Sequence, residues 1–141
     1  MSQEHLWGTH MHKHGINKNL MNINKKKHIL ILGGSSDIGM EVVNLFLKLN
    51  WEITAHFFKN KKKLEILKKK SNNLNLIKFD FSKHSNGIEK IISKKFNKKY
   101  DSIINLVGYT DNKGFENTNL NSILRSLIAN SILPILIEKH C

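Results

Sequence analysis

The chain has 141 residues, enough for one domain with a hydrophobic core, and its 40% hydrophobic content is typical of a folded soluble protein. Its longest uncharged apolar run, SLIANSILPILI, has 12 residues and is too short to cross a membrane. The N-terminus lacks the order of basic, apolar and small residues that marks a secretory signal, and the only cysteine is Cys141. We therefore expect a cytoplasmic protein without a membrane segment.

The chain is strongly basic, with a formal net charge of +12, and a basic surface can bind nucleic acid by releasing counterions. The base is almost entirely lysine, however, since Arg125 is the only arginine, and 58 of the 141 residues are Lys, Asn or Ile. Base readout favours Arg, whereas an AT-rich genome enriches Lys, Asn and Ile in any protein. The sequence therefore favours a solvated lysine surface, and nucleic-acid binding is the weaker alternative.

The stretch 29–50 predicts a strand, a glycine turn and a helix. Residues 29–32 are aliphatic, as in a buried strand, and glycine and serine follow them directly. The apolar residues that follow recur at helical spacing, so we expect them on the buried face of the helix: Ile38, Val42, Leu45, Phe46 and Leu49. The N-terminus of such a helix has unpaired N–H groups and a positive dipole, so it is a natural site for a phosphate.

Strand and helix patterns then alternate to the end of the chain. Residues 51–57 predict a strand with one apolar side, formed by Trp51, Ile53, Ala55 and Phe57. The remaining predicted elements are a helix over 60–70, a strand over 74–81, a helix over 86–98, a strand over 102–108 and a long apolar helix over 119–139. This βαβαβαβα order predicts the α/β class, as an incomplete Rossmann-type doubly wound parallel sheet of about four strands. Its ligand should bind at the carboxyl ends of the strands.

Four short motifs occur in the order and spacing of one known family. LGGSSDIG (32–39) resembles its glycine turn, FDFS (79–82) the Asp after its third strand, NLVG (105–108) its NNAG motif, and ANSILP (129–134) the segment with its active-site Asn. Together they resemble the short-chain dehydrogenase/reductase family. The resemblance implies the NAD(P)-binding portion of an oxidoreductase that interconverts a carbonyl and an alcohol by hydride transfer.

The resemblance also divides the chain. It covers residues 27–141 and corresponds to the N-terminal, dinucleotide-binding half of a typical family member. Residues 1–26 lie outside it, and we expect them to be a disordered or non-native extension. Because Met21 starts shortly before the first strand, residues 1–20 should be dispensable.

The glycine turn has the residue types that a pyrophosphate site needs. Gly33 allows a tight turn, Gly39 allows close packing of the helix, and Ser35 and Ser36 offer N–H and hydroxyl donors. Asp37 replaces a glycine of the family motif, and we expect it to turn away from the phosphates and cap the helix. The cofactor-binding residues expected overall are Gly33, Ser35, Ser36, Ile38, Gly39, Lys59, Asp80, Phe81, Asn105, Val107 and Gly108.

The residues after the later strands take their expected roles from the resemblance. Asp80 and Phe81 would border the adenine, and Val107 and Gly108 would leave room for the cofactor. Asn105 would tie neighbouring strands together, as the first Asn of the family motif does.

The choice of cofactor depends on the end of the second strand. An acidic residue about 20 positions beyond the glycines would bind the ribose 2′-hydroxyl of NAD. The sequence has HFFKNKKK there instead, so Lys59, with Asn60 and Lys61, could neutralise the 2′-phosphate of NADP. We expect NADP as the cofactor, with NAD possible and an ordinary surface lysine run as the alternative.

Asn130 is the candidate for the catalytic machinery. Pro134 follows it by four residues and has no N–H to donate to the Asn130 carbonyl, so the helix should be interrupted and this carbonyl free for water. This agrees with the family's use of this Asn to hold a water of the proton relay. A helix merely kinked by proline, with Asn130 on its surface, is the alternative.

The 141 residues do not contain the rest of the family's catalytic set, a Ser after the fifth strand and a Tyr-x-x-x-Lys helix. Tyr109 and Lys113 match the second spacing, but they follow the fourth strand directly in a loop-forming TDNKG segment, so we interpret the match as chance. We therefore leave open whether the chain is an enzyme and expect it to be inactive alone. A non-catalytic nucleotide-binding regulator is the alternative.

Two further features concern partners. His10, His12 and His14 could bind a transition metal weakly, but no fold is predicted around them and we expect no metal site. The apolar residues of the 119–140 helix cover more than one face, more than one sheet layer can bury. We therefore expect a homo-oligomer through this helix, besides a small carbonyl or alcohol substrate in the full-length enzyme.

Overall fold

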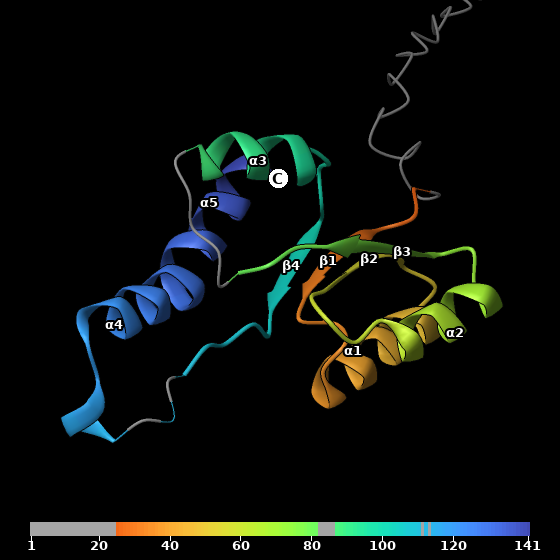
Figure 1. Cartoon of the computed structure of the whole chain (residues 1–141). Helices are drawn as coiled ribbons and strands as arrows, with labels where there is room; N and C mark the ends of the chain where they lie inside the picture. Colours follow the sequence, from red (N-terminus) through yellow and green to blue (C-terminus); the bar gives the residue numbers. More distant parts are fainter. Residues whose placement is uncertain (1–24, 82–86, 111, 113) are drawn as a thin grey trace, which may run out of the picture.

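Four parallel strands form the centre of the protein, in the spatial order β3-β2-β1-β4 (Figure 1). The computed structural model describes residues 25–81, 87–110, 112 and 114–141. The strands are β1 (His28–Leu32), β2 (Glu52–Phe57), β3 (Leu74–Lys78) and β4 (Ser102–Asn105). In the central strand, Ile29 pairs with Ile53 of β2 on one side and with Ser102 of β4 on the other. From β1 the chain adds β2 and β3 on one side, and it then returns to place β4 on the other side of β1. The point where the strand order reverses therefore lies between the neighbouring strands β1 and β4.

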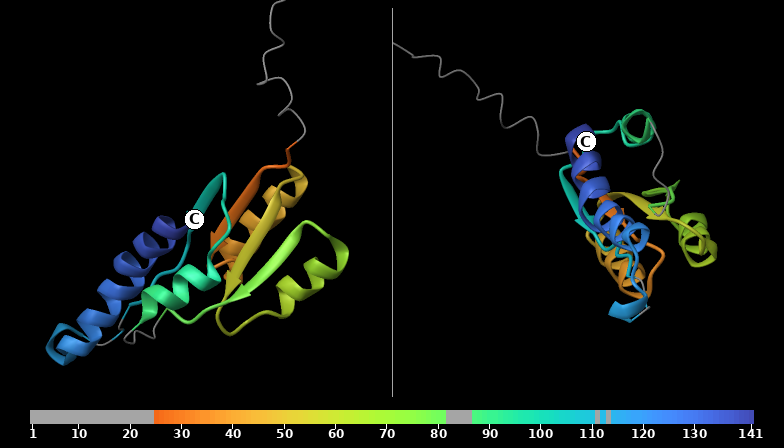
Figure 2. Two further views of the ribbon diagram at one scale, coloured as in Figure 1. Left: turned by 90° about the horizontal axis from the view of Figure 1, so that it is seen from above. Right: turned by 60° about the vertical axis from the view of Figure 1, so that its left-hand side comes forward.

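Helices cover both faces of this sheet (Figures 1 and 2). They are α1 (Asp37–Lys48), α2 (Lys62–Lys70), α3 (Ile88–Lys95), the short 3-10 helix η2 (Phe115–Asn117), α4 (Leu120–Leu127), the π-helix η3 (Ile128–Ile132) and α5 (Leu133–His140). Helices α1 and α2 lie on one face, and α3 and α5 on the other. The predicted doubly wound α/β fold of four strands is confirmed.

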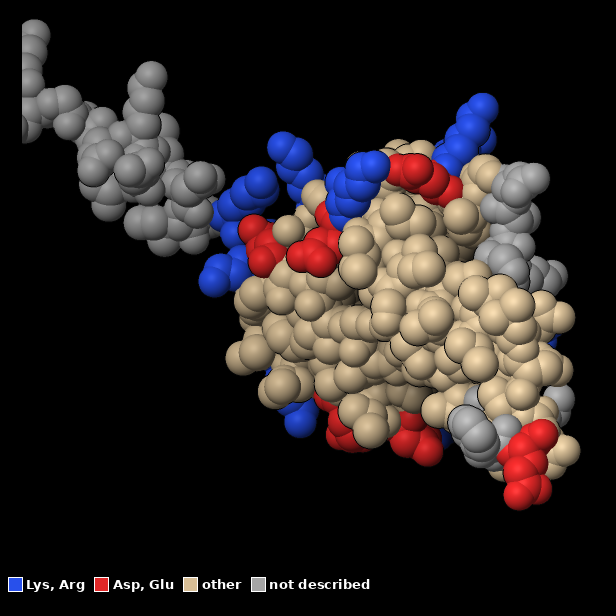
Figure 3. Space-filling model, turned by 90° about the vertical axis from the view of Figure 1, so that its left-hand side faces the viewer, with Lys and Arg blue, Asp and Glu red and all other residues tan. Residues whose placement is uncertain are grey.

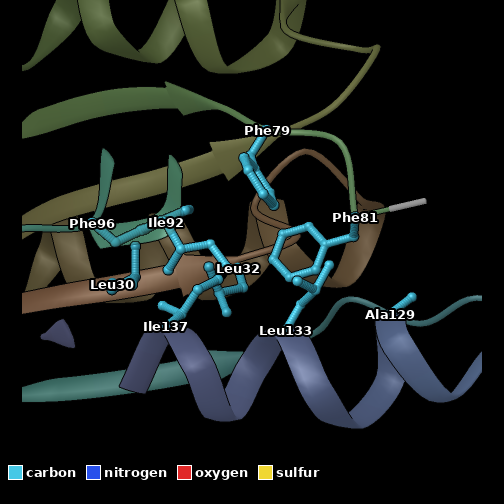
Figure 4. Close-up of a cluster of buried hydrophobic side chains, with 9 residues drawn as sticks. All are labelled: Leu30, Leu32, Phe79, Phe81, Ile92, Phe96, Ala129, Leu133 and Ile137. Atoms are coloured by element: carbon cyan, nitrogen blue, oxygen red, sulfur yellow. The ribbon is translucent and has the colours of Figure 1, made fainter. Parts of the chain in front are cut away.

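The side chains of alternate residues of β1 lie in two separate hydrophobic cores, one on each face of the sheet. Ile29 and Ile31 pack in the core under α1 and α2, and Leu30 and Leu32 pack in the core under α3 and α5. Because both faces are covered, β1 is a continuous apolar run rather than an alternating one. The second core is shown in Figure 4 and contains Leu30, Leu32, Phe79, Phe81, Ile92, Phe96, Ala129, Leu133 and Ile137.

The buried face of α1 differs from the predicted one. Ile38, Leu45 and Leu49 are 70%, 53% and 56% exposed, whereas Val43 is completely buried. The stripe that faces the sheet contains Gly39 and Val43, four residues apart, and Gly39 has no apolar side chain to reveal it in the sequence. Val42 and Phe46 are partly buried and pack against the core under α1 and α2, as predicted. The helix was therefore predicted correctly, but only part of its predicted buried face is confirmed.

Two strands end earlier than the sequence predicted. Strand β3 ends at Lys78 and β4 at Asn105, against predicted ends at 81 and 108. The residues beyond these ends, among them Asp80, Phe81, Val107 and Gly108, therefore lie in the loops at the carboxyl edge. This is the edge where the doubly wound fold is expected to bind its ligand.

The long C-terminal helix contains the predicted interruption. A π-helical turn spans Ile128–Ile132, and the Leu133 N–H donates to the Ile128 carbonyl across it. The turn lies just ahead of Pro134, which cannot donate a backbone hydrogen bond.

Among the described residues, the run Leu120–His140 meets the length and composition needed to cross a membrane, with a mean hydropathy of 1.5. Core helices of soluble proteins can meet this criterion too, so the expected lack of a membrane segment stays a prediction.

Candidate functional site

A cavity of about 490 Å³ opens at the carboxyl edge of the sheet. It lies where the loop after β1 meets the loop after β4, the position at which the strand order reverses. Open α/β sheets bind ligands at this point. The ends of all four strands contribute to its lining, with Gly33, Ser35, Ser36, His56, Phe58, Lys59, Asn60, Asp80, Phe81, Leu106, Val107, Gly108, Tyr109 and Ala129.

The turn after β1 requires glycine at its first position. Gly33 has a φ of +82°, a conformation that side chains rarely adopt, and a Cβ there would lie 2.9 Å from the Leu106 carbonyl oxygen. The Ser36 N–H and the Ser36 hydroxyl both donate to the Gly33 carbonyl, at 3.1 and 2.9 Å. The turn is thus closed on itself and packed against the chain that follows β4.

Helix α1 begins directly at the cavity with Ser36 as its N-cap. The Ser36 hydroxyl accepts the N–H of Gly39 at 3.0 Å, which leaves the N–H groups of Asp37 and Ile38 without an intrahelical acceptor. A Cβ on Gly39 would lie 2.2 Å from the Gly33 carbonyl oxygen, so only glycine lets the helix approach the turn so closely. The site therefore presents a positive helix end with unpaired donors.

Asp37 does not cap the helix, and that prediction was wrong. Ser36 and Asp37 are both good N-cap residues, and the structure uses the first of them. The Asp37 carboxylate points outward, is 96% exposed and lies 3.1 Å from the Lys63 ammonium. Asp37 is not part of the cavity lining, which agrees with the expectation that its carboxylate turns away from this place.

His56 lines the cavity, although no role was expected for it from the sequence. It is only 3% exposed. Its Nδ1 accepts the Gly33 N–H at 3.0 Å, and its Nε2 lies 2.9 Å from the Phe79 carbonyl oxygen. Burial lowers the pKa of His56 from the ordinary value of 6.5, and the hydrogen bond to Phe79 opposes this to a smaller extent. The sequence did contain a signal for this site: His56 lies near the carboxyl end of a predicted interior strand, where both faces of the sheet are buried.

Two ionisable side chains of opposite sign line the cavity, besides His56 and Tyr109. Lys59 follows β2, and its ammonium lies 5.3 Å from the centre of the Phe58 ring. Asp80 follows β3. The chain has no acidic residue between Glu52 and Glu65, so the end of β2 provides a cation and no carboxylate. Among the described residues, no group of three His, Cys, Asp or Glu side chains could hold a metal ion.

Asn130 fixes the loop that follows β4. The Tyr109 N–H donates to Asn130 Oδ1 at 2.7 Å, and Asn130 Nδ2 donates to the Tyr109 carbonyl at 2.9 Å. Both residues also line a second hollow of about 330 Å³, together with Ser122. The role of the Asn130 carbonyl stays a prediction. Lys113 lies outside the described residues, so the chance nature of the Tyr109 match also stays a prediction.

Comparison with known proteins identifies the architecture. No family sequence profile matches the chain, and no curated protein sequence matches it. Solved structures do. A short-chain dehydrogenase from Leptospira borgpetersenii with bound NAD+ has a TM-score of 0.65 and 25% identity over 94% of this chain and 51% of that one. ElxO with NADP bound has a TM-score of 0.67 and 21% identity over 82% and 49%. A Sphingobium yanoikuyae short-chain dehydrogenase in complex with NADPH has a TM-score of 0.66 and 16% identity over 81% of this chain and 46% of that one.

The fold is that of short-chain dehydrogenases/reductases. The chain spans about half the length of these solved structures, 51%, 49% and 46% in the three cases. The expected resemblance to this family, and the fold that it implied, are confirmed.

Most residues predicted for the cofactor site of this short-chain dehydrogenase/reductase fold come together around the cavity at the carboxyl edge. Those that line it are Gly33, Ser35, Ser36, Lys59, Asp80, Phe81, Val107 and Gly108. Ile38, Gly39 and Asn105 do not line it. Gly39 lets α1 approach the Gly33 turn closely, and Ile38 contributes its backbone N–H at the α1 N-terminus. Asn130 lies beside the second hollow instead.

Two predicted contacts are different in the structure. The Ser36 hydroxyl already donates to Gly33 and accepts from Gly39, so it is not a spare donor for a ligand. Asn105 was expected to tie strands together, but its Oδ1 accepts the N–H of Val107, two residues later, at 3.1 Å. Short polar side chains commonly bond the backbone two residues on, and Asn105 shapes its own turn in this way.

Proposed function

We propose that this chain binds NAD(P) in the cavity at the carboxyl edge of the sheet, as the cofactor-binding portion of a short-chain dehydrogenase/reductase. The observation that carries the proposal is the Gly33 turn, which leads into the capped N-terminus of α1 at the point where the strand order reverses. The unpaired N–H groups of Asp37 and Ile38 are suited to the pyrophosphate. Structural neighbours with NADP, NAD+ or NADPH bound support the same choice of ligand.

The cavity has walls suited to the two ends of such a cofactor. Phe81 is 5% exposed and, with Phe58 and Asp80, borders the side near β3, where the adenine would lie. Val107 and Gly108 line the side near β4, and a Cβ on Gly108 would meet nothing within 4 Å, so there is open space for the nicotinamide half. An extended dinucleotide would thus cross the α1 N-terminus at its middle.

NADP is the preferred cofactor in this proposal. Lys59 lies at the end of β2, the position that would meet the ribose of the adenosine half, and no carboxylate is present there to bind a 2′-hydroxyl or repel a 2′-phosphate. A charge-assisted hydrogen bond to the extra phosphate contributes about 1.5–3 kcal/mol. NAD would bind the same cavity without this contribution.

Titration with NADPH and NADH at low salt tests the proposal. NADPH should bind more tightly, and Lys59→Glu should weaken NADPH by roughly tenfold or more while affecting NADH less. Lys70→Glu makes the same charge change in the last turn of α2, away from the cavity, and should leave both affinities nearly unchanged. Equal affinity of the wild-type chain for both cofactors would contradict the NADP preference. Absence of binding to either would contradict the function.

The reaction proposed for the full-length protein is reversible hydride transfer between a carbonyl and an alcohol. The bound cofactor supplies the hydride chemistry, and this chain's residues would bind and orient it. We expect no carbonyl reduction by the 141-residue chain alone, because it lacks the serine and Tyr-x-x-x-Lys pattern of the family. Single-stranded nucleic acid that displaces both cofactors at physiological salt would favour the basic-binder alternative.

We also propose that the α4–α5 surface pairs with a second copy of the chain. On the face seen in Figure 3, Lys, Arg, Asp and Glu lie mainly around the margin, although the chain carries a net charge of +12. The exposed large apolar side chains of this helical run are Leu120, Ile123, Leu124, Leu127, Ile132 and Ile135. Strand β4 is also at an edge of the described sheet. Arg125, Glu138 and Lys139 are the exposed charged residues of this run. A mainly apolar surface beside an open strand edge favours association in solution.

A further inference from the structure

We propose that His56 is a positioning residue of the dinucleotide site, whose neutral ring fixes the Gly33 turn relative to the segment that follows β3. The inference rests on the proposed cofactor binding and adds to it a residue and a pH dependence. His56 joins two segments that would bind different parts of one cofactor, the pyrophosphate turn and the adenine wall. Its two hydrogen bonds, to the Gly33 N–H at 3.0 Å and to the Phe79 carbonyl at 2.9 Å, span the distance between them.

The two partners of His56 determine its protonation state. The Gly33 N–H is a donor only, so Nδ1 must be unprotonated to accept it. The Phe79 carbonyl is an acceptor only, so Nε2 must carry the proton. Only the neutral Nε2–H tautomer satisfies both. A protonated ring would direct its Nδ1–H at the Gly33 N–H and lose that bond.

Packing prevents the ring from turning to another arrangement. His56 is 3% exposed and contacts the edge of Phe81 with ring centres 4.8 Å apart. Phe81 in turn contacts Phe79, at 5.2 Å. The same side chain therefore determines the position of the glycine turn and of the aromatic wall. Loss of this side chain would therefore affect both walls of the proposed site together.

Few charges face His56 from the surrounding elements. The ionisable residues that line the same cavity are Lys59 after β2, Asp80 after β3 and Tyr109 after β4. The elements on its other sides contribute apolar groups of the α3–α5 core. Burial and the Phe79 carbonyl are the causes of the lowered pKa of His56, in that order. The ring should therefore be neutral near pH 7 and charge only below its ordinary pKa of 6.5.

Titration of the 141-residue chain with NADP+ at pH 7.5 and pH 5.0 tests the inference, with His56→Leu and His56→Asn as the variants. His56→Leu removes both hydrogen bonds and should weaken binding about tenfold or more at the higher pH. His56→Asn places Oδ1 near the position of Nδ1, where it can accept the Gly33 N–H, and should bind more tightly than the Leu variant. Wild type should lose more affinity toward acid pH than the Asn variant. The 2′-phosphate also titrates near pH 6, so the variants are compared at equal pH.

His28→Asn is the matched control. His28 also has a pKa lowered by burial, but it begins β1 at the opposite edge of the sheet and does not line the cavity. Its replacement should leave NADP+ affinity and its pH dependence unchanged. Equal NADP+ affinity of wild type and His56→Leu, or equal pH dependence of wild type and His56→Asn, would overturn the inference.

Amide hydrogen exchange tests the hydrogen bond of His56 to Gly33 independently of cofactor binding. Without cofactor, the Gly33 amide should be protected in wild type and in His56→Asn and should exchange faster in His56→Leu, because only the Leu variant removes its acceptor. A chain that shows this pattern but binds no NADP+ would disprove the proposed function alone. A Gly33 amide that exchanges equally fast in all three proteins would overturn the inference about His56.

Discussion

Gly39→Ala provides a sharp prediction, because two physical effects predict opposite signs. Gly39 lies in the first turn of α1, and helix propensity alone predicts that alanine stabilises an α-helix by about 1 kcal/mol relative to glycine. In the structure, however, the new Cβ would lie 2.2 Å from the Gly33 carbonyl oxygen and 2.8 Å from two backbone atoms of Gly34. All three atoms belong to the backbone, so no side chain can rotate away to relieve the contact.

The size of the effect follows from this geometry. An ordinary non-bonded contact between carbon and oxygen is about 3.3 Å, so the turn or the helix must move by roughly 1 Å. Overpacking of this kind costs about 1–3 kcal/mol, which exceeds or equals the gain in propensity. We expect a net loss of stability of up to about 2 kcal/mol. NADP+ affinity should fall about tenfold or more, because a hydrogen bond from the moved backbone to a charged phosphate contributes about 1.5–3 kcal/mol.

Urea denaturation followed by circular dichroism, together with calorimetric titration of NADP+, measures both effects. Gly114→Ala is the control, since a Cβ there meets nothing within 4 Å and Gly114 does not line the cavity. It should change neither quantity appreciably. A Gly39→Ala protein that is more stable than wild type and binds NADP+ equally well would refute the close approach of α1 to the Gly33 turn.

The remaining predictions concern stability and association. His28 and His56 have lowered pKa values in the folded chain, so the unfolded chain binds more protons below about pH 6.5. The free energy of unfolding should therefore be highest above this pH and fall toward pH 5, which urea midpoints measure. The lowered pKa of Glu89 acts only below its ordinary 4.5 and should not contribute in this window. Deletion of residues 1–20 should leave the melting temperature and NADP+ affinity unchanged, and a large loss of either would place this segment in the fold. The 141-residue chain should self-associate in light scattering, and Ile135→Lys should reduce this; a monomeric wild type would contradict the proposed interface.

The sequence predicted the fold and most of the site because both depend on local patterns. The alternation of strands and helices determines a parallel sheet, and glycine, serine and lysine lie at the strand ends that converge on one edge. Apolar spacing predicted Val42 and Phe46 on the packed side of α1 correctly, but it also included Ile38, Leu45 and Leu49, which are exposed. His56 was missed because a polar residue in a strand suggests a solvated face, whereas a central parallel strand is buried on both. Ser36 and Asp37 are both N-cap residue types, so composition could not decide between them.

Chemical-shift mapping by nitrogen-15 NMR during an NADP+ titration tests the central claim most directly. The account predicts that the amides of Gly33, Asp37 and Ile38 shift most, with those of Val107 and Gly108, because the pyrophosphate would lie at the α1 N-terminus and the cofactor would extend toward β4. Shifts confined to the lysine-rich surfaces of α2 and α3, or the absence of any shift at saturating cofactor, would contradict it.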